Sequence, residues 1–242
     1  MTEAGSNWNI HNIVAYLPDI PRANMEQRGP PEFILEAFAD PASVKEVVKG
    51  ILHTIFFHRY FPLITPQTRP VLSLSLPYID DVELETLIEQ RAALLERQLD
   101  AERNTIAQQH HAPVPGSPGL GGRAGVGTAA GAQGGGGRGQ ISVKFSERKR
   151  RKAWIVRGEE EVCWECWTIK VTVAEPKTEN ERAKVRQAME QTLLAAVRKI
   201  MKYVNANKDH IPPITATSGN PFPYQITVNQ KEAGWAARMG IY

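Results

Sequence analysis

The sequence predicts an α+β fold in which three helices cover one face of a largely antiparallel sheet. Two patterns predict this class: three segments place apolar residues at helical spacing, and several shorter segments alternate apolar and polar residues. The segments follow one another as strand, helix, strand, helix, loop, strand, strand, helix, strand, an order typical of α+β proteins. With 242 residues, of which 42% are hydrophobic, the chain can bury a core.

The first block of elements begins with a strand over residues 32–38. Asp40 and Pro41 then supply an N-cap and a proline at the first helical position, so a helix is predicted to begin there. Its apolar residues recur at helical spacing and form one stripe, made of Val44, Val47, Val48, Ile51, Leu52, Ile55 and Phe56.

A second strand and a second helix follow in the same block. Leu72, Leu74 and Leu76 alternate with serines, which predicts a half-buried strand over residues 72–76. Asp80, with Glu83 three residues later, resembles a capping pair, and apolar residues at helical spacing extend this helix to residue 108.

The second block contains two strands before its helix. Ile141, Val143 and Phe145 alternate with polar residues, as expected for a strand. The run CWECWTIKVTV predicts a longer strand whose inner face consists of Trp167, Ile169, Val171 and Val173.

A third helix and a last short strand complete the pattern. Thr178 and Glu181 form a capping box at the start of the helix. The apolar side of this helix is predicted to consist of Val185, Met189, Leu193, Val197, Ile200, Met201 and Val204. The final strand is predicted from the alternation of Tyr224, Ile226 and Val228.

Glycine marks the boundary between the two blocks. Twelve of the 19 glycines fall between residues 116 and 139, so residues 112–140 are predicted to be a disordered, glycine-rich insertion. The rest of the chain then divides into a flexible N-terminal tail over residues 1–31, one domain over residues 32–230 and a C-terminal tail over residues 231–242.

Composition and motif content argue against several classes of protein. The formal net charge is only +3, so no general affinity for nucleic acid is expected. No signal peptide is recognisable, and no apolar run approaches the ~18 residues of a membrane span. The chain also lacks a nucleophile elbow, a P-loop and a Rossmann glycine pattern, so we expect no catalytic residues, no cofactor and no enzymatic activity.

Cys163 and Cys166 match the bare C-x-x-C pattern, which occurs in redox pairs and in zinc sites. A redox pair needs a helix N-terminus and zinc needs two further ligands, and neither is present here. On a regular strand the two side chains would also point to opposite faces. We therefore predict no metal site.

The least ordinary stretch is a basic run followed by apolar residues, at the expected tip of a hairpin. Arg148, Lys149, Arg150, Arg151 and Lys152 precede Trp154, Ile155 and Val156. Either the three apolar side chains fold back onto the sheet, or they form an aromatic anchor that inserts into a partner. The basic run is a candidate contact for an acidic membrane surface or for phosphates, or a nuclear signal.

Two segments resemble one known family. ILHTIFFHR (51–59) and WECWTIKVTV (164–173) are similar to runs in the autophagy-related protein 101 family, a HORMA-domain group. The resemblance implies a HORMA domain and a non-catalytic role. Members of that family pair with the HORMA domain of autophagy-related protein 13 and stabilise it within the kinase complex that initiates autophagosome formation.

The resemblance also implies a cytoplasmic location, at the preautophagosomal structure, and a Trp-x-Phe finger that recruits downstream factors. Trp154 matches the tryptophan of that finger, whereas Val156 stands at the position of the phenylalanine, or Ile155 if the loop register slips. The chain therefore keeps one of the two aromatic residues. An alternative interpretation is a nuclear HORMA adaptor that acts in chromatin or DNA repair, with the basic run as its targeting signal.

Overall fold

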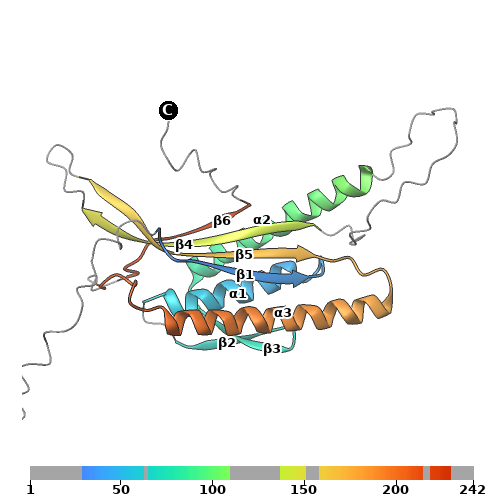
Figure 1. Ribbon diagram of the computed structural model, residues 1–242, viewed down its shortest axis with the longest axis horizontal. Coiled ribbons are helices and arrows are strands. Elements are labelled where there is room, and N and C mark those ends of the chain that lie inside the picture. The colour runs from blue at the N-terminus through green and yellow to red at the C-terminus, as the bar shows by residue number, and fades with distance from the viewer. Residues whose placement is uncertain (1–28, 63–64, 110–136, 151–157, 215–218, 230–242) are drawn as a thin grey trace, which may run out of the picture.

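A mixed four-stranded sheet forms the centre of the molecule (Figure 1). The computed structural model describes residues 29–62, 65–109, 137–150, 158–214 and 219–229. The sheet order is β1 (Glu32–Ala39), β5 (Glu159–Val173), β4 (Arg138–Arg150) and β6 (Tyr224–Val228). β1 runs parallel to β5, and the other two pairings are antiparallel. Among the described residues, the sheet is therefore largely antiparallel, as predicted.

Three helices pack against one face of this sheet. α1 (Val44–Arg59) lies between α2 (Val82–Gln109) and α3 (Glu179–Ala206), and α2 contacts β4 and β6 while α3 contacts β1. The burial pattern of β1 shows the covered face, since Phe33, Leu35, Ala37 and Ala39 are buried and the residues between them are exposed or half-buried. The α+β class with three helices is thus confirmed in the part of the chain that the structure describes.

The strand predicted over residues 72–76 is wrong, because this region forms a two-stranded hairpin. β2 (Gln67–Val71) pairs antiparallel with β3 (Leu74–Tyr78), and Leu72 lies in the turn with a φ of 53°. The alternation of leucines therefore spans a chain reversal, which period-two patterning alone does not reveal. The hairpin packs against α1 through β3.

The predicted helix starts are nearly correct. The capping box of Thr178 and Glu181 is present, and the two residues exchange hydrogen bonds at the start of α3. α1 begins at Val44 rather than at Pro41, because Asp40 Oδ1 accepts from the backbone N–H of Ser43 and holds a turn before the helix. Asp81, not Asp80, caps α2: its Oδ1 accepts from the N–H of Leu84 at 2.8 Å.

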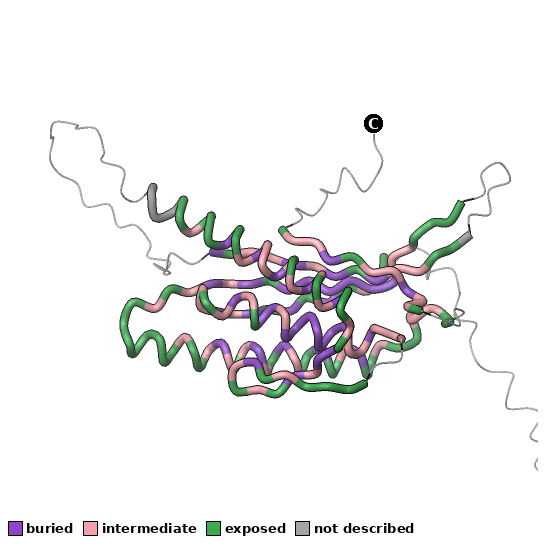
Figure 2. The backbone as a smooth tube through the Cα atoms, turned by 180° about the vertical axis from the view of Figure 1, so that it is seen from behind, coloured by how far each residue is buried: buried purple, intermediate pink, exposed green. Residues whose placement is uncertain are grey.

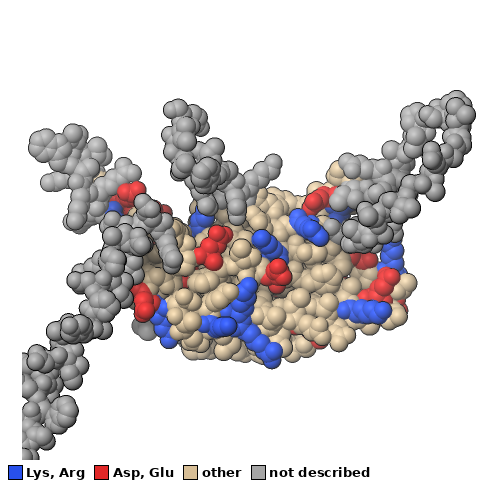
Figure 3. Space-filling model, in the orientation of Figure 1, with Lys and Arg blue, Asp and Glu red and all other residues tan. Residues whose placement is uncertain are grey.

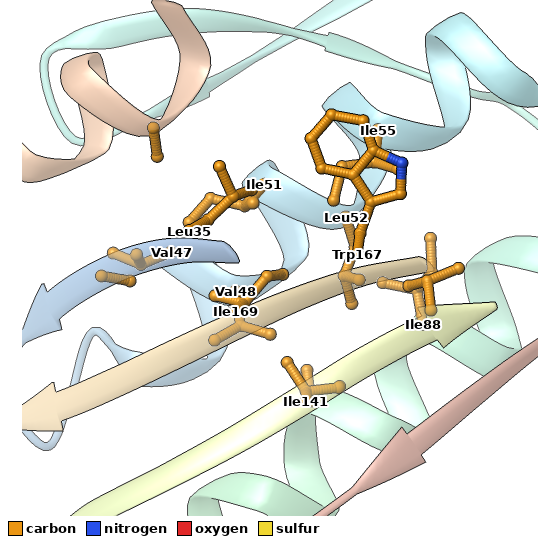
Figure 4. Packing of buried hydrophobic residues seen from close by; sticks show 14 of the residues in the cluster. Leu35, Val47, Val48, Ile51, Leu52, Ile55, Ile88, Ile141, Trp167 and Ile169 are labelled. Carbon is orange, nitrogen blue, oxygen red and sulfur yellow. The ribbon is translucent and has the colours of Figure 1, made fainter. Parts of the chain in front are cut away.

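The core lies between the sheet and α1, whose apolar stripe is buried as predicted (Figures 2 and 4). In Figure 4, Ile51, Leu52 and Ile55 of α1 face Trp167 and Ile169 of β5. Trp167 is the largest of the fully buried side chains. The predicted strand positions 141, 143 and 145 are also buried.

One boundary and one helix position differ from the sequence analysis. β4 already begins at Arg138, so residues 138–140 of the predicted insertion belong to the sheet, and residues 110–136 lie outside the described residues. Met201, predicted to be on the apolar side of α3, is 50% exposed. It follows Ile200 directly, and two successive helical residues are 100° apart, so only one of them faces the core.

Ile200→Ala and Met201→Ala therefore form a matched pair of variants. Ile200 is fully buried, so its truncation should lower the free energy of unfolding by about 2–5 kcal/mol. Met201→Ala should change it by less than about 0.5 kcal/mol. Urea denaturation of both variants measures the difference, and equal losses would contradict the placement of α3.

Candidate interaction site

The two segments that carry the family resemblance meet in a buried ion pair. Arg59 is the last residue of α1, and its Nε donates to Oε1 and Oε2 of Glu165, on β5, at 2.8 and 3.0 Å. The arginine side chain is 3% exposed and the glutamate side chain is completely buried. A buried carboxylate is stable only when it is paired and hydrogen-bonded, so this contact constrains both elements.

Two further donors approach the same carboxylate. Trp167 Nε1 lies 2.5 Å from Oε1, and His210 Nε2 lies 2.7 Å from Oε2. Arg59 Nη2 also donates to the carbonyl of Asn207, directly after α3. The network therefore joins the end of α1, the middle of β5 and the segment that leaves α3.

Sequence analysis missed this network, although Arg59 and Glu165 lie within the quoted motifs. A signal was present, because Glu165 is flanked by apolar and aromatic residues in a run otherwise suited to burial. Two of its partners, Arg59 and His210, are 106 and 45 residues away in the sequence, so only the folded chain identifies them.

A β-bulge shapes β5 beside the network. The register between β4 and β5 shifts after Phe145, so that Trp164 has no partner residue on β4. The Trp164 ring instead lies 5.7 Å from the ring of His210 and 5.2 Å from that of Phe222. These contacts position the chain that leads from α3 to β6.

The bulge corrects one expectation about the cysteines. Cys163 pairs with Ser146 and Cys166 with Lys144, two residues on the same face of β4, so both thiols lie on one face of the sheet rather than on opposite faces. Burial raises the pKa of both thiols, that of Cys166 to about 11. Both therefore remain protonated at neutral pH, which is unfavourable for redox chemistry and for metal binding.

The two histidines of ILHTIFFHR differ in their burial. His53 is buried, with its ring 4.5 Å from that of Tyr78, and its Nδ1 accepts from the N–H of Ile79 at 3.5 Å. Burial, with a further contribution from Arg69, lowers the pKa of His53 to about 4. His58 lies in the last turn of α1 and is half-buried. Neither is close to a set of metal ligands, since the described residues contain no cluster of three or more His, Cys, Asp or Glu suited to a metal ion.

The stem of the β4–β5 hairpin pairs basic with acidic residues. In register, Arg148 lies opposite Glu161, Lys149 opposite Glu160 and Arg150 opposite Glu159. Arg148 Nε lies 3.9 Å from Glu161 Oε1, and both side chains are more than half exposed. The acidic strand therefore offsets the positive charge of the described part of the basic run.

The predicted finger itself lies outside the described residues. Residues 151–157 are not described, and they include Arg151, Lys152, Trp154, Ile155 and Val156. The side chain of Arg150 is also not described. The structure thus gives the stem that leads to the predicted finger but not the contacts of its residues.

A separate basic surface lies on α3. From residue 191 to residue 208 the chain has no acidic residue, whereas Arg198, Lys199, Lys202 and Lys208 are all exposed. Figure 3 shows Lys and Arg side chains gathered over this helix. No described helix is long and apolar enough to cross a membrane.

Comparison with known proteins identifies the family. A family model described as Autophagy-related protein 101 matches residues 36–218, a span that contains both motifs, the buried network and the β4–β5 hairpin. The chain belongs to the autophagy-related protein 101 family. This membership places the protein in autophagy.

Relatives of the same name occur in fungi, plants and animals. Autophagy-related protein 101 from Schizosaccharomyces pombe is 27% identical over 193 residues, which cover 79% of this chain and 83% of the relative. The Arabidopsis thaliana protein is 24% identical over 206 residues, covering 76% and 80%. The Homo sapiens protein is 23% identical over 185 residues, covering 76% of each chain.

Glu165→Gln tests the buried ion pair of this family member. The substitution keeps the shape of the side chain but leaves Arg59 buried without its counter-charge, so the free energy of unfolding should fall by about 3–5 kcal/mol. Glu161→Gln, in the exposed pair with Arg148, is the control and should cost less than about 1 kcal/mol. Urea denaturation at neutral pH measures both, and similar small losses would show that the network does not stabilise the fold.

His53 should make stability depend on pH. Because its pKa in the folded protein, about 4, lies below the ordinary value of 6.5, the unfolded chain binds a proton that the folded chain does not. The contribution of His53 to the free energy of unfolding is complete above about pH 6.5 and is lost as the pH falls towards 4. The total loss is roughly 3 kcal/mol. Urea denaturation between pH 4.5 and 7 should show a shallower dependence for His53→Asn, and unchanged slopes would contradict this assignment.

Proposed function

We propose that the protein is a non-catalytic adaptor in autophagosome formation that pairs with the HORMA domain of autophagy-related protein 13. In this role it stabilises that partner within the autophagy-initiation Ser/Thr kinase complex. The observation that carries the proposal is the family match over residues 36–218, which includes the network of Arg59 and Glu165. The finer role follows from the family resemblance of the two motifs.

The architecture supports a HORMA assignment. Three helices on one face of a largely antiparallel sheet are the arrangement that the resemblance implies for this domain. The fold therefore agrees with a protein whose function is to present surfaces to other proteins.

The chemistry of the described residues supports a binding role over a catalytic one. The buried carboxylate of Glu165 is fully occupied by donors from Arg59, Trp167 and His210. The thiols of Cys163 and Cys166 have raised pKa values, so they are poor nucleophiles. We therefore assign no catalytic residue, metal or cofactor to this protein.

The hairpin between β4 and β5 is the proposed site for recruiting further proteins. Trp154, with Ile155 and Val156, forms the proposed finger, and the charged stem keeps the hairpin soluble up to its tip. Burial of ~200 Å² of a tryptophan at ~25 cal/mol/Å² corresponds to about 5 kcal/mol before ordering costs, enough for a binding hot spot.

The proposed location of the protein follows from the family resemblance. We assign it to the cytoplasm and to the preautophagosomal structure. Peripheral contact with an acidic membrane would depend on Arg151 and Lys152, since Arg148 and Lys149 lie opposite glutamates. The same pairing weakens the alternative of a nuclear adaptor that binds DNA, because a phosphate contact needs uncompensated positive charge.

Affinity purification of the tagged protein from starved cells, followed by mass spectrometry, tests this proposal. We expect to recover a second HORMA protein together with a Ser/Thr kinase. Recovery of chromatin or repair proteins in their place would contradict the autophagy assignment and favour the nuclear alternative.

Trp154→Ala and Trp164→Ala separate recruitment from folding. Trp154→Ala should keep the HORMA partner and the kinase, lose the proteins that bind the finger, and change the free energy of unfolding by less than about 0.5 kcal/mol. Trp164 is buried, so Trp164→Ala should cost about 3–5 kcal/mol. Thermal and urea denaturation report both values, and a large loss for Trp154→Ala would place its ring in the core rather than in a finger.

A further inference from the structure

The buried side chain of His53, on α1, has one hydrogen-bonded nitrogen and one without a partner. The residue is 3% exposed. Its Nδ1 accepts from the backbone N–H of Ile79, directly after β3, at 3.5 Å. Its Nε2 is buried and has no hydrogen-bond partner among the described residues. Buried polar atoms without a partner are rare in folded proteins, and a bound water or ion is a common reason for one.

The bond to Ile79 determines which nitrogen of His53 carries the proton. Burial lowers the pKa of His53 to about 4, so the imidazole is neutral at neutral pH and has a single N–H. Because Nδ1 accepts a hydrogen bond, this proton is on Nε2. Nε2 is therefore a donor in need of an acceptor, and a buried donor without one destabilises the fold.

A small cavity lies beside this ring, between α1 and the β2–β3 hairpin. His53, Lys49 and Gly50 line it from the helix, and Val71 and Leu76 line it from the hairpin. Helical side chains lean towards the N-terminus of their helix, so the His53 ring extends over the turn that contains Lys49 and Gly50. The space within reach of a water-sized sphere is about 10 Å³, which is about what one buried water molecule requires.

The charges around the cavity favour a neutral occupant. Lys49 already pairs with Glu46 and Glu89, and Arg69, which also lines the cavity, pairs with Glu85. Little positive charge remains to hold an anion away from bulk water. A metal ion is unfavourable as well, because a protonated Nε2 cannot coordinate it. Water fits this site, since it accepts from an N–H and donates two hydrogens of its own.

We infer that one water molecule is bound in this cavity and accepts a hydrogen bond from His53 Nε2. The side chain of Glu46 lines the same cavity and offers an acceptor for the hydrogens of the water. Both nitrogens of His53 are then hydrogen-bonded at the place where α1 meets the β2–β3 hairpin. The inference does not depend on the proposed function.

Nuclear magnetic resonance of the full chain at neutral pH tests both the donor and the water. Long-range correlations between ring protons and ring nitrogens should place the proton of His53 on Nε2. A proton on Nδ1 would overturn the inference, because Nε2 would then not donate.

Cross-peaks between the water resonance and carbon-bound protons of His53 and Gly50 detect the water itself. A long-lived water gives NOE and ROE cross-peaks of opposite sign, whereas mobile surface water gives peaks of the same sign. We expect opposite signs at these two residues. His58, half-buried in the last turn of the same helix, is the internal control and should show only the pattern of mobile water. The same pattern at His53 would overturn the inference.

A matched pair of substitutions separates the donor from the cavity. His53→Gln keeps an N–H donor and an acceptor for Ile79, so the water cross-peaks of Gly50 should persist. His53→Phe removes the donor and should abolish them. Val71→Ile fills the cavity from the hairpin and leaves the donor in place, so it should also abolish them, and it provides the test if His53→Phe does not fold. Water cross-peaks that persist in Val71→Ile would overturn the inference, because the water would then be bound elsewhere.

Discussion

The buried carboxylate of Glu165 is the constraint on which much of this structure depends. An ionised carboxylate without water needs donors of its own, and this one receives them from α1, from its own strand and from the segment after α3. Three parts of the chain that are distant in sequence must therefore meet in one arrangement. An apolar residue of the same size could pack in many arrangements of these elements, whereas directional hydrogen bonds are satisfied in only a few of them. We interpret the ion pair as a determinant of a unique arrangement more than of raw stability.

The route of the chain from α3 to β6 follows from this constraint. His210 bonds to Glu165, its ring lies beside Trp164, and Trp164 also contacts Phe222 just before β6. The carbonyl of Pro223 then accepts from the N–H of Ser146, next to the β-bulge. The edge strand β6 and the base of the β4–β5 hairpin are thus positioned by the same set of contacts. For the proposed recruitment role of this hairpin, a rigid base would be favourable, because less entropy is lost when a partner binds.

Patterns in the sequence predicted the parts of the fold that depend on one element at a time. The stripe of α1 and the capping box at Thr178 required only neighbouring residues, and both are present in the structure. The hairpin turn at Leu72 was missed because leucine rarely adopts a positive φ and no glycine or asparagine marks the turn. Arg59 and His210 could not be predicted as partners of Glu165, because only folding brings them together. The bulge at Trp164 was missed for a similar reason, since it depends on how β4 pairs with β5.

The distribution of charge separates the structural and the binding parts of the molecule. Inside, Arg59 and Glu165 neutralise one another and leave no charge for a ligand. On the hairpin stem, opposite charges face each other across the strands, so the stem remains solvated without attracting polyanions strongly. In the proposed function, selectivity would come from Trp154, Ile155 and Val156, because a nearly neutral stem contributes little directional attraction. This division agrees with the proposed function, in which the protein binds particular partner proteins.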